Sequence, residues 1–306
     1  MKFFVSCFIV MSITIPAFAQ DVVVIPNILE RGKYMFQMTG CMNCHSPEKN
    51  KPLAGGFKIT TQFGNFYSPN ISSDKNFGIG KWSDEDFLKA VKRGISPEKK
   101  FYYPAFPFTA YSKLTDEDVL AIKAYIMSLP PQAVANKPHE LKTLFKNRLV
   151  LLPWRSINFR KHFNSKNAQS VYKIKGDFKA NPLKSDGWNR GAYLTEAAFH
   201  CTECHTPRNA LGGLETKKWM SGAPFDNGKE IATNITSDKK TGKGMWTRDD
   251  WNTFLNEGET PTGEIVDGDM WLVVKNGTSK LTDADREDVI TYLQELKAVT
   301  NDMKSN

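Results

Sequence analysis

The hydrophobic and polar residues of this chain form short segments with helical periodicity, separated by long loops. Residues 83–93 and 247–257 each begin with Ser or Thr, carry Asp three residues later and are followed by Gly, which is the pattern of a capped helix. Residues 115–129 and 282–296 have similar polar starts and place their apolar residues on one helical face: Val119, Ile122, Ile126 and Leu129, then Val289, Leu293 and Leu296. No sustained strand-like alternation occurs in the sequence, so we expect an all-α fold.

These segments belong to two copies of one sequence unit, which we call the first and second repeat. Matching segments occur in the same order, at an offset that drifts from 159 to 167 residues: Arg31-Gly32-Lys33-Tyr34 with Arg190-Gly191-Ala192-Tyr193, Asn70 to Asp74 with Asn234 to Asp238, and Lys113 to Asp116 with Lys280 to Asp283. A few residues are therefore inserted in the second repeat. The pattern indicates tandem duplication of one domain, with three short helices in each copy.

The first nineteen residues have the character of a secretory signal peptide. Lys2 precedes an apolar run from Phe3 to Pro16, and Ala17-Phe18-Ala19 follows. The run is too short, and wrongly flanked, for a membrane-spanning helix. A retained N-terminal anchor is the alternative. We expect cleavage after Ala19 and export to the periplasm.

The formal net charge of +8 indicates which kinds of partner to expect. An exported protein does not meet nucleic acid, so this charge suits an acidic protein partner or an anionic membrane surface, or simply favours solubility. The segment between the repeats is basic, and its apolar part is Leu141–Phe163. That part is either a strap packed across both repeats or a docking surface for a partner or a membrane.

Without Cys7, which leaves with the signal peptide, the cysteines form two C-x-x-C-H motifs. They are Cys41-Met42-Asn43-Cys44-His45 and Cys201-Thr202-Glu203-Cys204-His205. In an exported chain this motif indicates haem attachment: the two thiols bond to one haem, and the histidine binds its iron. Disulfides would leave both histidines unexplained, and a zinc site needs pairs closer than these. A thioredoxin-like pair would be single and set in an α/β pattern. We therefore expect two covalently bound haem c groups, held by Cys41, Cys44, Cys201 and Cys204, with His45 and His205 as axial ligands.

The order of a helix, C-x-x-C-H, a long loop and a closing helix with an aromatic residue resembles the class I cytochrome c fold. The tandem form resembles the diheme cytochromes of bacterial dehydrogenases, especially the cytochrome subunits of membrane-bound alcohol and sugar-acid dehydrogenases. Segments that carry this resemblance are Tyr103–Pro107, Lys113–Asp118, Trp188–Gly191 and His205–Arg208. It implies two cytochrome c domains, residues 20–130 and 188–306, joined by a connector, residues 131–187.

The resemblance also implies roles for residues outside the motifs. The carbonyl groups of Pro47 and Pro207 would orient the two histidines. Four further residues would lie near haem edges and propionates, or would instead stabilise their own loops: Asn70, Trp82, Asn234 and Trp246.

Class I domains usually supply a methionine as the second axial ligand, from the loop before the last helix. In the second repeat Met270 occupies that place, eleven residues before Leu281, and a core methionine is the alternative. The first repeat has Phe106 at the family position and no methionine between Met42 and Met127. We therefore expect its haem iron to be five-coordinate or bound by an unusual ligand, for which the candidates are Lys100, Tyr102, Tyr103 and His139. Without methionine this haem should have the lower potential, so electrons would run from the first haem to the second.

Two functions are consistent with these residues. The first is a periplasmic electron carrier, without substrate chemistry of its own, between a dehydrogenase and another cytochrome, a quinone site or an oxidase. The second is a haem enzyme, such as a peroxidase or a catalyst of small-molecule or sulfur-compound redox chemistry, that uses the first haem. A ligand sensor would need a signalling domain, and the sequence suggests none.

Overall fold

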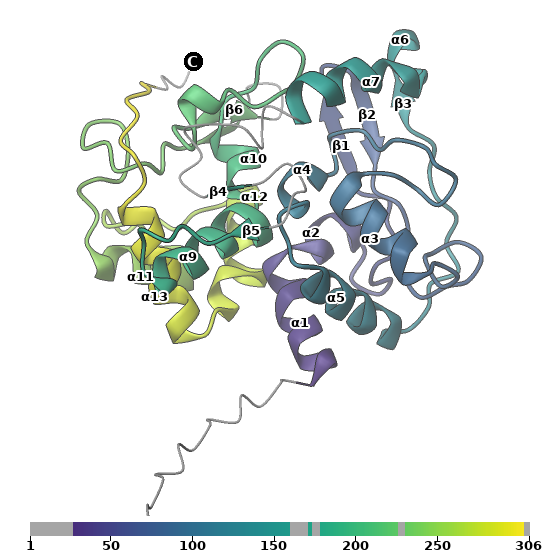
Figure 1. Ribbon diagram of the computed structural model, residues 1–306, viewed down its shortest axis with the longest axis horizontal. Helices are drawn as coiled ribbons and strands as arrows, with labels where there is room; N and C mark the ends of the chain where they lie inside the picture. The colour runs from purple at the N-terminus through teal and green to yellow at the C-terminus, as the bar shows by residue number, and fades with distance from the viewer. Residues whose placement is uncertain (1–26, 160–170, 173–177, 226–229, 303–306) are drawn as a thin grey trace, which may run out of the picture.

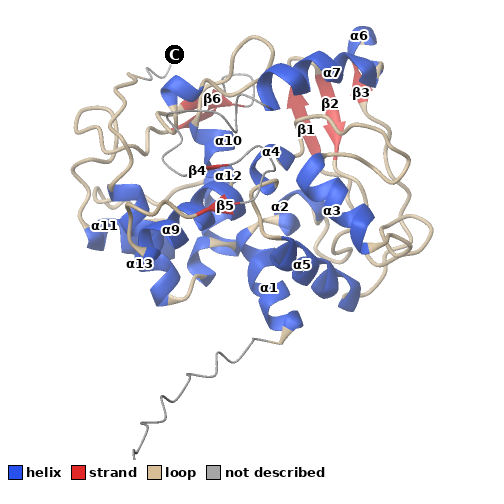
Figure 2. Cartoon of the chain, in the orientation of Figure 1, coloured by secondary structure: helices blue, strands red, loops and turns tan. Residues whose placement is uncertain are grey.

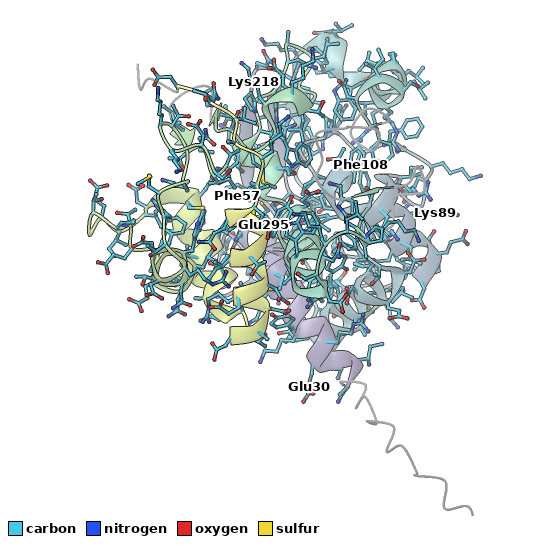
Figure 3. All side chains as sticks on the ribbon, turned by 60° about the vertical axis from the view of Figure 1, so that its left-hand side comes forward. Glu30, Phe57, Lys89, Phe108, Lys218 and Glu295 are labelled. Atoms are coloured by element: carbon cyan, nitrogen blue, oxygen red, sulfur yellow. The ribbon has the colours of Figure 1, made fainter. Side chains whose placement is uncertain are left out.

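A computed structural model describes residues 27–159, 171–172, 178–225 and 230–302, so the expected signal peptide lies outside the described residues. The two repeats lie side by side, the first in purple to teal and the second in green to yellow (Figure 1). The labelled Glu30, Lys89 and Lys218 are exposed and lie toward the outside of the molecule (Figure 3). Within the described ranges, no helix combines the length and apolar character that crossing a membrane requires.

Short helices and long loops make up both repeats, as the sequence predicts. The first repeat contains α1 (Ile28–Met38), α2 (Cys41–His45), α3 (Asp84–Arg93), α4 (Phe108–Tyr111) and α5 (Asp116–Ser128). The second contains α9 (Asp186–Tyr193), α10 (Cys201–His205), α11 (Arg248–Glu257), α12 (Gly268–Asn276) and α13 (Asp283–Gln294). The capping boxes predicted for α3 and α11 are confirmed, and each of these helices ends at a glycine in the left-handed region.

Small antiparallel sheets accompany the helices, so the all-α prediction is incomplete (Figure 2). One three-stranded sheet has the strand order β1–β2–β3, and its strands are Lys58–Thr61, Gly64–Tyr67 and Glu140–Leu141. Two further pairs are β4 (Val171–Tyr172) with β5 (Phe178–Lys179), and β6 (Ala223–Phe225) with β7 (Glu230–Ala232). Strands of two to four residues are too short to produce a recognisable alternation in the sequence.

One hydrophobic cluster runs through both repeats. It contains Met35 and Phe36 from α1, Trp188 from α9 and Tyr292 from α13, each at most 2% exposed. Helix α1 packs on α5 in the first repeat, and α9 packs on α13 in the second. The two repeats therefore share a continuous apolar interior.

Equivalent residues of the two repeats exchange hydrogen bonds across their interface. Each bond joins a tyrosine of one repeat to an aspartate of the other, and the aspartate also binds an arginine of its own repeat. The contacts are Tyr34 to Asp285 at 2.6 Å with Arg190 to Asp285 at 2.8 Å, and Tyr193 to Asp118 at 2.5 Å with Arg31 to Asp118 at 2.8 Å. This reciprocity gives the interface an approximate two-fold relation.

A buried ion pair also joins the repeats. The Nζ of Lys113 lies 3.2 Å from a carboxylate oxygen of Glu196, and both side chains are fully buried. The Tyr292 hydroxyl donates to the other carboxylate oxygen. Burial lowers the pKa of Lys113, because it disfavours the charged amine, while Glu196 opposes that effect.

The described part of the connector contacts both repeats. It contains α6 (Thr143–Lys146), α7 (Leu151–Trp154) and short turns at Arg148–Val150 and Arg155–Phe159. Leu151 packs beside Phe66 and Tyr103 of the first repeat, while the Trp154 indole donates to the carbonyl of Leu211 in the second at 2.9 Å. Through these contacts the connector packs against both repeats, as a strap would. Leu144 and Leu149 nevertheless remain 66% and 65% exposed, and residues 160–163 of the predicted apolar part lie outside the described residues.

Two candidate haem-binding sites

Each C-x-x-C-H motif forms a one-turn helix directly after a core helix. In the first repeat α1 ends, Gly40 adopts a φ of +62°, and α2 begins at Cys41. In the second repeat His200 takes the same left-handed position at a φ of +45° before α10. Glycine adopts this conformation readily, whereas other L-residues do so at a conformational cost.

A backbone carbonyl from a distant loop orients each motif histidine. The Nδ1 of His45 lies 2.7 Å from the carbonyl oxygen of Pro69, and the Nδ1 of His205 lies 2.6 Å from that of Thr233. The expectation for Pro47 and Pro207 is therefore wrong. Pro47 is exposed, and the Pro207 carbonyl accepts a hydrogen bond from the Glu215 amide. The acceptor comes from the tertiary fold, which adjacency in sequence does not reveal.

These hydrogen bonds put both imidazoles in the form that binds a metal. Burial lowers the pKa of His45 and of His205, because it disfavours the charged ring. In a neutral ring whose Nδ1–H donates to a carbonyl, Nε2 carries the lone pair that can bind a metal.

Three motif cysteines, Cys41, Cys44 and Cys201, are partly buried, whereas Cys204 is exposed. Burial raises the pKa of Cys41 and Cys44 to about 11 and that of Cys201 to about 12. These thiols are therefore protonated at neutral pH, unlike the thiolates of reactive cysteines. Within the described ranges, no group of three or more His, Cys, Asp or Glu side chains could hold a metal ion.

The two motifs lie close to each other across the repeat interface. His200, which directly precedes the second motif, packs on Tyr111, and the Tyr111 hydroxyl binds the carbonyl of Thr39, just before the first motif. The Asn276 amide of α12 donates to the Asn43 side chain of α2 at 2.7 Å. Groups bound at the two motifs would therefore be neighbours.

Asn70 and Asn234 organise the loops that hold these carbonyl acceptors. Asn70 directly follows Pro69; its amide nitrogen donates to the carbonyls of Gln132 and Val134, and its side-chain oxygen accepts two bonds from Ser72. Asn234 follows Thr233 and makes an equivalent set of bonds, including one to the Val299 carbonyl at 2.8 Å. The structure thus shows these residues in loop-organising roles next to the histidine acceptors.

Trp82 and Trp246 are half-buried against the shared hydrophobic cluster. The Trp82 carbonyl accepts a hydrogen bond from Lys123 at 2.8 Å. The Trp246 ring packs against Trp251 with centroids 4.8 Å apart, and the Lys243 ammonium lies 4.5 Å from its centroid. Both indoles have a clear packing role, and the haem-edge role stays a prediction.

The described methionines differ sharply in exposure. Met35, Met38 and Met220 are at most 2% exposed and belong to the core, whereas Met42, Met127 and Met245 are 38–70% exposed. Met270 is half-buried in the first turn of α12. Its role as an axial ligand stays a prediction.

Most candidate ligands for the first haem have other roles. The Tyr103 hydroxyl donates to the Phe145 carbonyl at 2.6 Å, and the Nδ1 of His139 accepts from the Tyr67 amide at 3.1 Å. Lys100 is exposed. Tyr102 packs edge-on against Phe106, the residue at the family methionine position.

The sequence reasoning missed the residues that connect the two motifs. His200 packs edge-on against Tyr111 of the first repeat, with ring centroids 5.4 Å apart. The Tyr111 hydroxyl donates to the Thr39 carbonyl at 2.6 Å. The contrast between His200 and Gly40 at equivalent positions is the sequence signal that could have identified this contact.

Comparisons with known proteins agree with this geometry. Residues 29–130 match the cytochrome c family model. The chain is 36% identical over 274 residues to a diheme cytochrome c-type protein of Cereibacter sphaeroides, covering 88% of this chain and 86% of that protein. It is 34% identical both to the cytochrome subunit of fructose dehydrogenase from Gluconobacter japonicus and to the cytochrome c subunit of gluconate 2-dehydrogenase from Pantoea cypripedii.

Those alignments cover 88% and 89% of this chain, but only 53% and 60% of the two dehydrogenase subunits. The oriented histidines and the paired cysteines suit haem c. The matches support the same cofactor. The chain therefore belongs to the cytochrome c family that includes this diheme c-type protein, and its cofactor is haem c.

Proposed function

We propose that this protein carries electrons through two haem c groups, from a dehydrogenase to a downstream respiratory acceptor. The observation that carries the proposal is the pair of equivalent sites, each with a C-x-x-C-H helix and a histidine whose Nδ1 faces a loop carbonyl. The closeness of the two motifs suits a short electron relay. Similarity to dehydrogenase cytochrome subunits supports a dehydrogenase partner.

In this proposal the residues of each repeat hold one haem. Cys41 and Cys44 attach the first and Cys201 and Cys204 the second, while His45 and His205 bind the irons. Met270 is the second ligand at the second haem. When bound, each haem supplies an iron that gains or loses one electron. Both motif histidines are buried, and the Pro69 and Thr233 carbonyls fix their orientation.

A haem count together with electron paramagnetic resonance tests this assignment. We expect two haems per chain and, in the oxidised protein, a low-spin signal from the second haem. Replacing Cys201 and Cys204 with alanine should leave one haem, as should the matched replacement of Cys41 and Cys44. A single haem in the unaltered protein would contradict the two-haem proposal.

A haem enzyme is the second candidate function. Phe106 replaces the family methionine and packs against Tyr102 and Tyr111, so its apolar ring offers the first haem no ligand. An open iron can bind a small molecule, because axial vacancy and distal polarity decide between ligand binding and electron transfer. Rapid peroxide turnover with an artificial electron donor would favour this function, whereas reversible one-electron reduction without turnover would favour the carrier.

We also propose a periplasmic location and attachment to the membrane surface through partners. The signal-like residues 1–19 support export, and exposed leucines within the basic connector support peripheral association. Cell fractionation with N-terminal sequencing tests both points. We expect a chain that begins at Gln20 and that high salt releases from membranes. An uncleaved cytoplasmic chain would contradict the proposal.

A further inference from the structure

The third residue of each C-x-x-C-H motif contacts the opposite repeat. These residues are Asn43 in α2 and Glu203 in α10, which lie at equivalent positions between the two cysteines of their motifs. The Asn276 amide donates to the side-chain oxygen of Asn43 at 2.7 Å, and the Thr109 hydroxyl donates to a carboxylate oxygen of Glu203 at 2.5 Å. Each attachment helix is therefore tied to the other repeat by a hydrogen bond between side chains.

The two partner residues are themselves equivalent. Thr109 lies four residues before Lys113, and Asn276 lies four residues before Lys280, which are matched lysines of the two repeats. The contacts therefore follow the approximate two-fold relation of the interface, although the residue types differ. Because the same two positions meet on both sides, the contact arises from how the two repeats pack and not from one local loop.

Both partner residues belong to segments that are expected to face an iron. Asn276 is the last residue of α12, which packs on α2 and carries Met270 in its first turn. Thr109 lies in α4, three residues after Phe106, where the first repeat lacks its methionine. Helices of nine and four residues are too short to be stable by themselves, so tertiary contacts determine where they lie.

The two contacts differ in charge. The Glu203 side chain is only 9% exposed, and its second carboxylate oxygen accepts a hydrogen bond from Arg208 at 2.5 Å. The Arg208 charge balances that of the carboxylate, whereas Asn43 and Asn276 are both neutral. Hydrogen bonds to a charged group are stronger than those between neutral groups. The contact that holds α4 is therefore the stronger of the two.

We propose that Asn43 and Glu203 are positioning residues that act across the interface: each belongs to the attachment helix of one haem and holds the segment that faces the iron of the other. This inference rests on the proposed binding of two haems and, for Asn43, on Met270 as an axial ligand. A substitution at Asn43 should therefore change ligand exchange at the second haem. A residue that stabilised only its own motif would instead affect the haem attached there.

Imidazole binding to the oxidised, fully haem-loaded protein measures how easily Met270 leaves the second iron. Stopped-flow absorption should show a slow phase that is limited by the departure of the methionine, and Met270→Leu identifies this phase by abolishing it. We expect Asn43→Ala to speed the slow phase severalfold, because the end of α12 loses its tether. Asn276→Ala removes the same bond from the other side and should have the same effect.

Two controls test whether this effect comes from the contact itself. Met42→Ala changes the neighbouring residue of the same motif, whose side chain is 45% exposed, and should leave the slow phase unchanged. Replacing Asn43 and Asn276 together should be no faster than either single change, because both remove one interaction. In each variant the electron paramagnetic resonance signal of the first haem should match that of the unaltered protein.

The role of Glu203 is tested at the first haem. Thr109→Val removes the hydroxyl with little change in volume, so it breaks the contact and leaves the pair of Glu203 with Arg208 in place. We expect this variant to shift the electron paramagnetic resonance signal of the first haem. Glu203→Gln keeps an acceptor for the Thr109 hydroxyl and should retain that signal.

The outcomes distinguish this inference from the proposed function. With two haems bound, an unchanged slow phase in both Asn43→Ala and Asn276→Ala would overturn the role of Asn43, as would additive effects or a change confined to the first haem. An unchanged signal in Thr109→Val would overturn the role of Glu203. Each of these results leaves the carrier function intact, whereas a single haem in the unaltered protein would overturn the proposed function and this inference together.

Discussion

At the scale of single residues, the two sites differ most at their second axial positions. The half-buried Met270 stands where a thioether ligand is expected, while the first repeat presents Phe106 within a cluster of aromatic rings. A thioether favours ferrous iron and raises the haem potential. The first haem is therefore expected to have the lower potential and to pass electrons to the second.

Phe106→Met should supply the missing thioether. Axial ligands set haem potentials over about 0.8 V, so we expect the first potential to rise by on the order of 0.1 V and any high-spin signal to disappear. Potentiometry and electron paramagnetic resonance check this result. Phe101→Met, a change in the neighbouring aromatic cluster, is the matched control and should leave the potential unchanged.

Met270→Leu should remove the ligand of the second haem with little change in side-chain volume. We expect the second potential to fall by on the order of 0.1 V and a high-spin signal to appear, because leucine offers no lone pair. Met245→Leu is the control, since Met245 is 70% exposed and precedes α11. Unchanged low-spin spectra in Met270→Leu would assign the ligand to another residue.

At the scale of elements, one added residue explains a difference between equivalent helices. Arg31 and Arg190 are 159 residues apart, whereas Cys41 and Cys201 are 160 apart, so the second repeat contains one extra residue between them. The structure accommodates it as a π-helical segment, Leu194–Ala198, which continues α9. This segment carries Glu196, the buried partner of Lys113, so the insertion serves the contact between the repeats.

The loop before α11 should give the protein a defined acid sensitivity. Hydrogen bonds from the Thr241 amide and the Thr300 hydroxyl lower the pKa of Asp238 to about 2. Because an unfolded aspartate has a pKa of about 3.9, the native state binds fewer protons between these values. The stabilisation is present above about pH 4 and is lost as the pH falls through about 2.

Asp238→Asn should flatten the fall in stability between about pH 4 and 2, since asparagine does not titrate. Urea unfolding at a series of pH values measures this effect. If the unfolding free energy falls with the same slope against pH in the variant and in the unaltered protein across this window, Asp238 does not govern the acid response.

At the scale of the whole molecule, buried polar contacts fix how the repeats meet. Lys113 and Glu196 are fully buried and paired, and Tyr292 also binds Glu196. Removing one member of a buried pair leaves an uncompensated charge, whereas removing both charges is far less costly. The pair therefore specifies the arrangement of the repeats more than it adds net stability.

Lys113→Met should cost about 3–5 kcal/mol of unfolding free energy, because Glu196 then loses its counter-charge. Adding Glu196→Gln should recover most of this loss, since glutamine is uncharged and can still accept the Tyr292 hydrogen bond. Urea unfolding of both single variants and the double variant measures the coupling. If the double variant lost as much unfolding free energy as the two single variants together, the two residues would act independently.

The sequence alone determined the repeat, the capped helices and the attachment motifs, because these depend on local spacing and on residue chemistry. C-x-x-C-H places its three side chains on one short helix, and the polar caps of α3 and α11 bind their own first turns. Only the tertiary structure decided which distant groups these residues contact. The Pro69 carbonyl lies 24 residues from His45, Lys113 lies 83 residues from Glu196, and the His200 ring packs on Tyr111 of the other repeat. Such contacts arise when distant segments pack around a shared apolar core, and no local pattern records them.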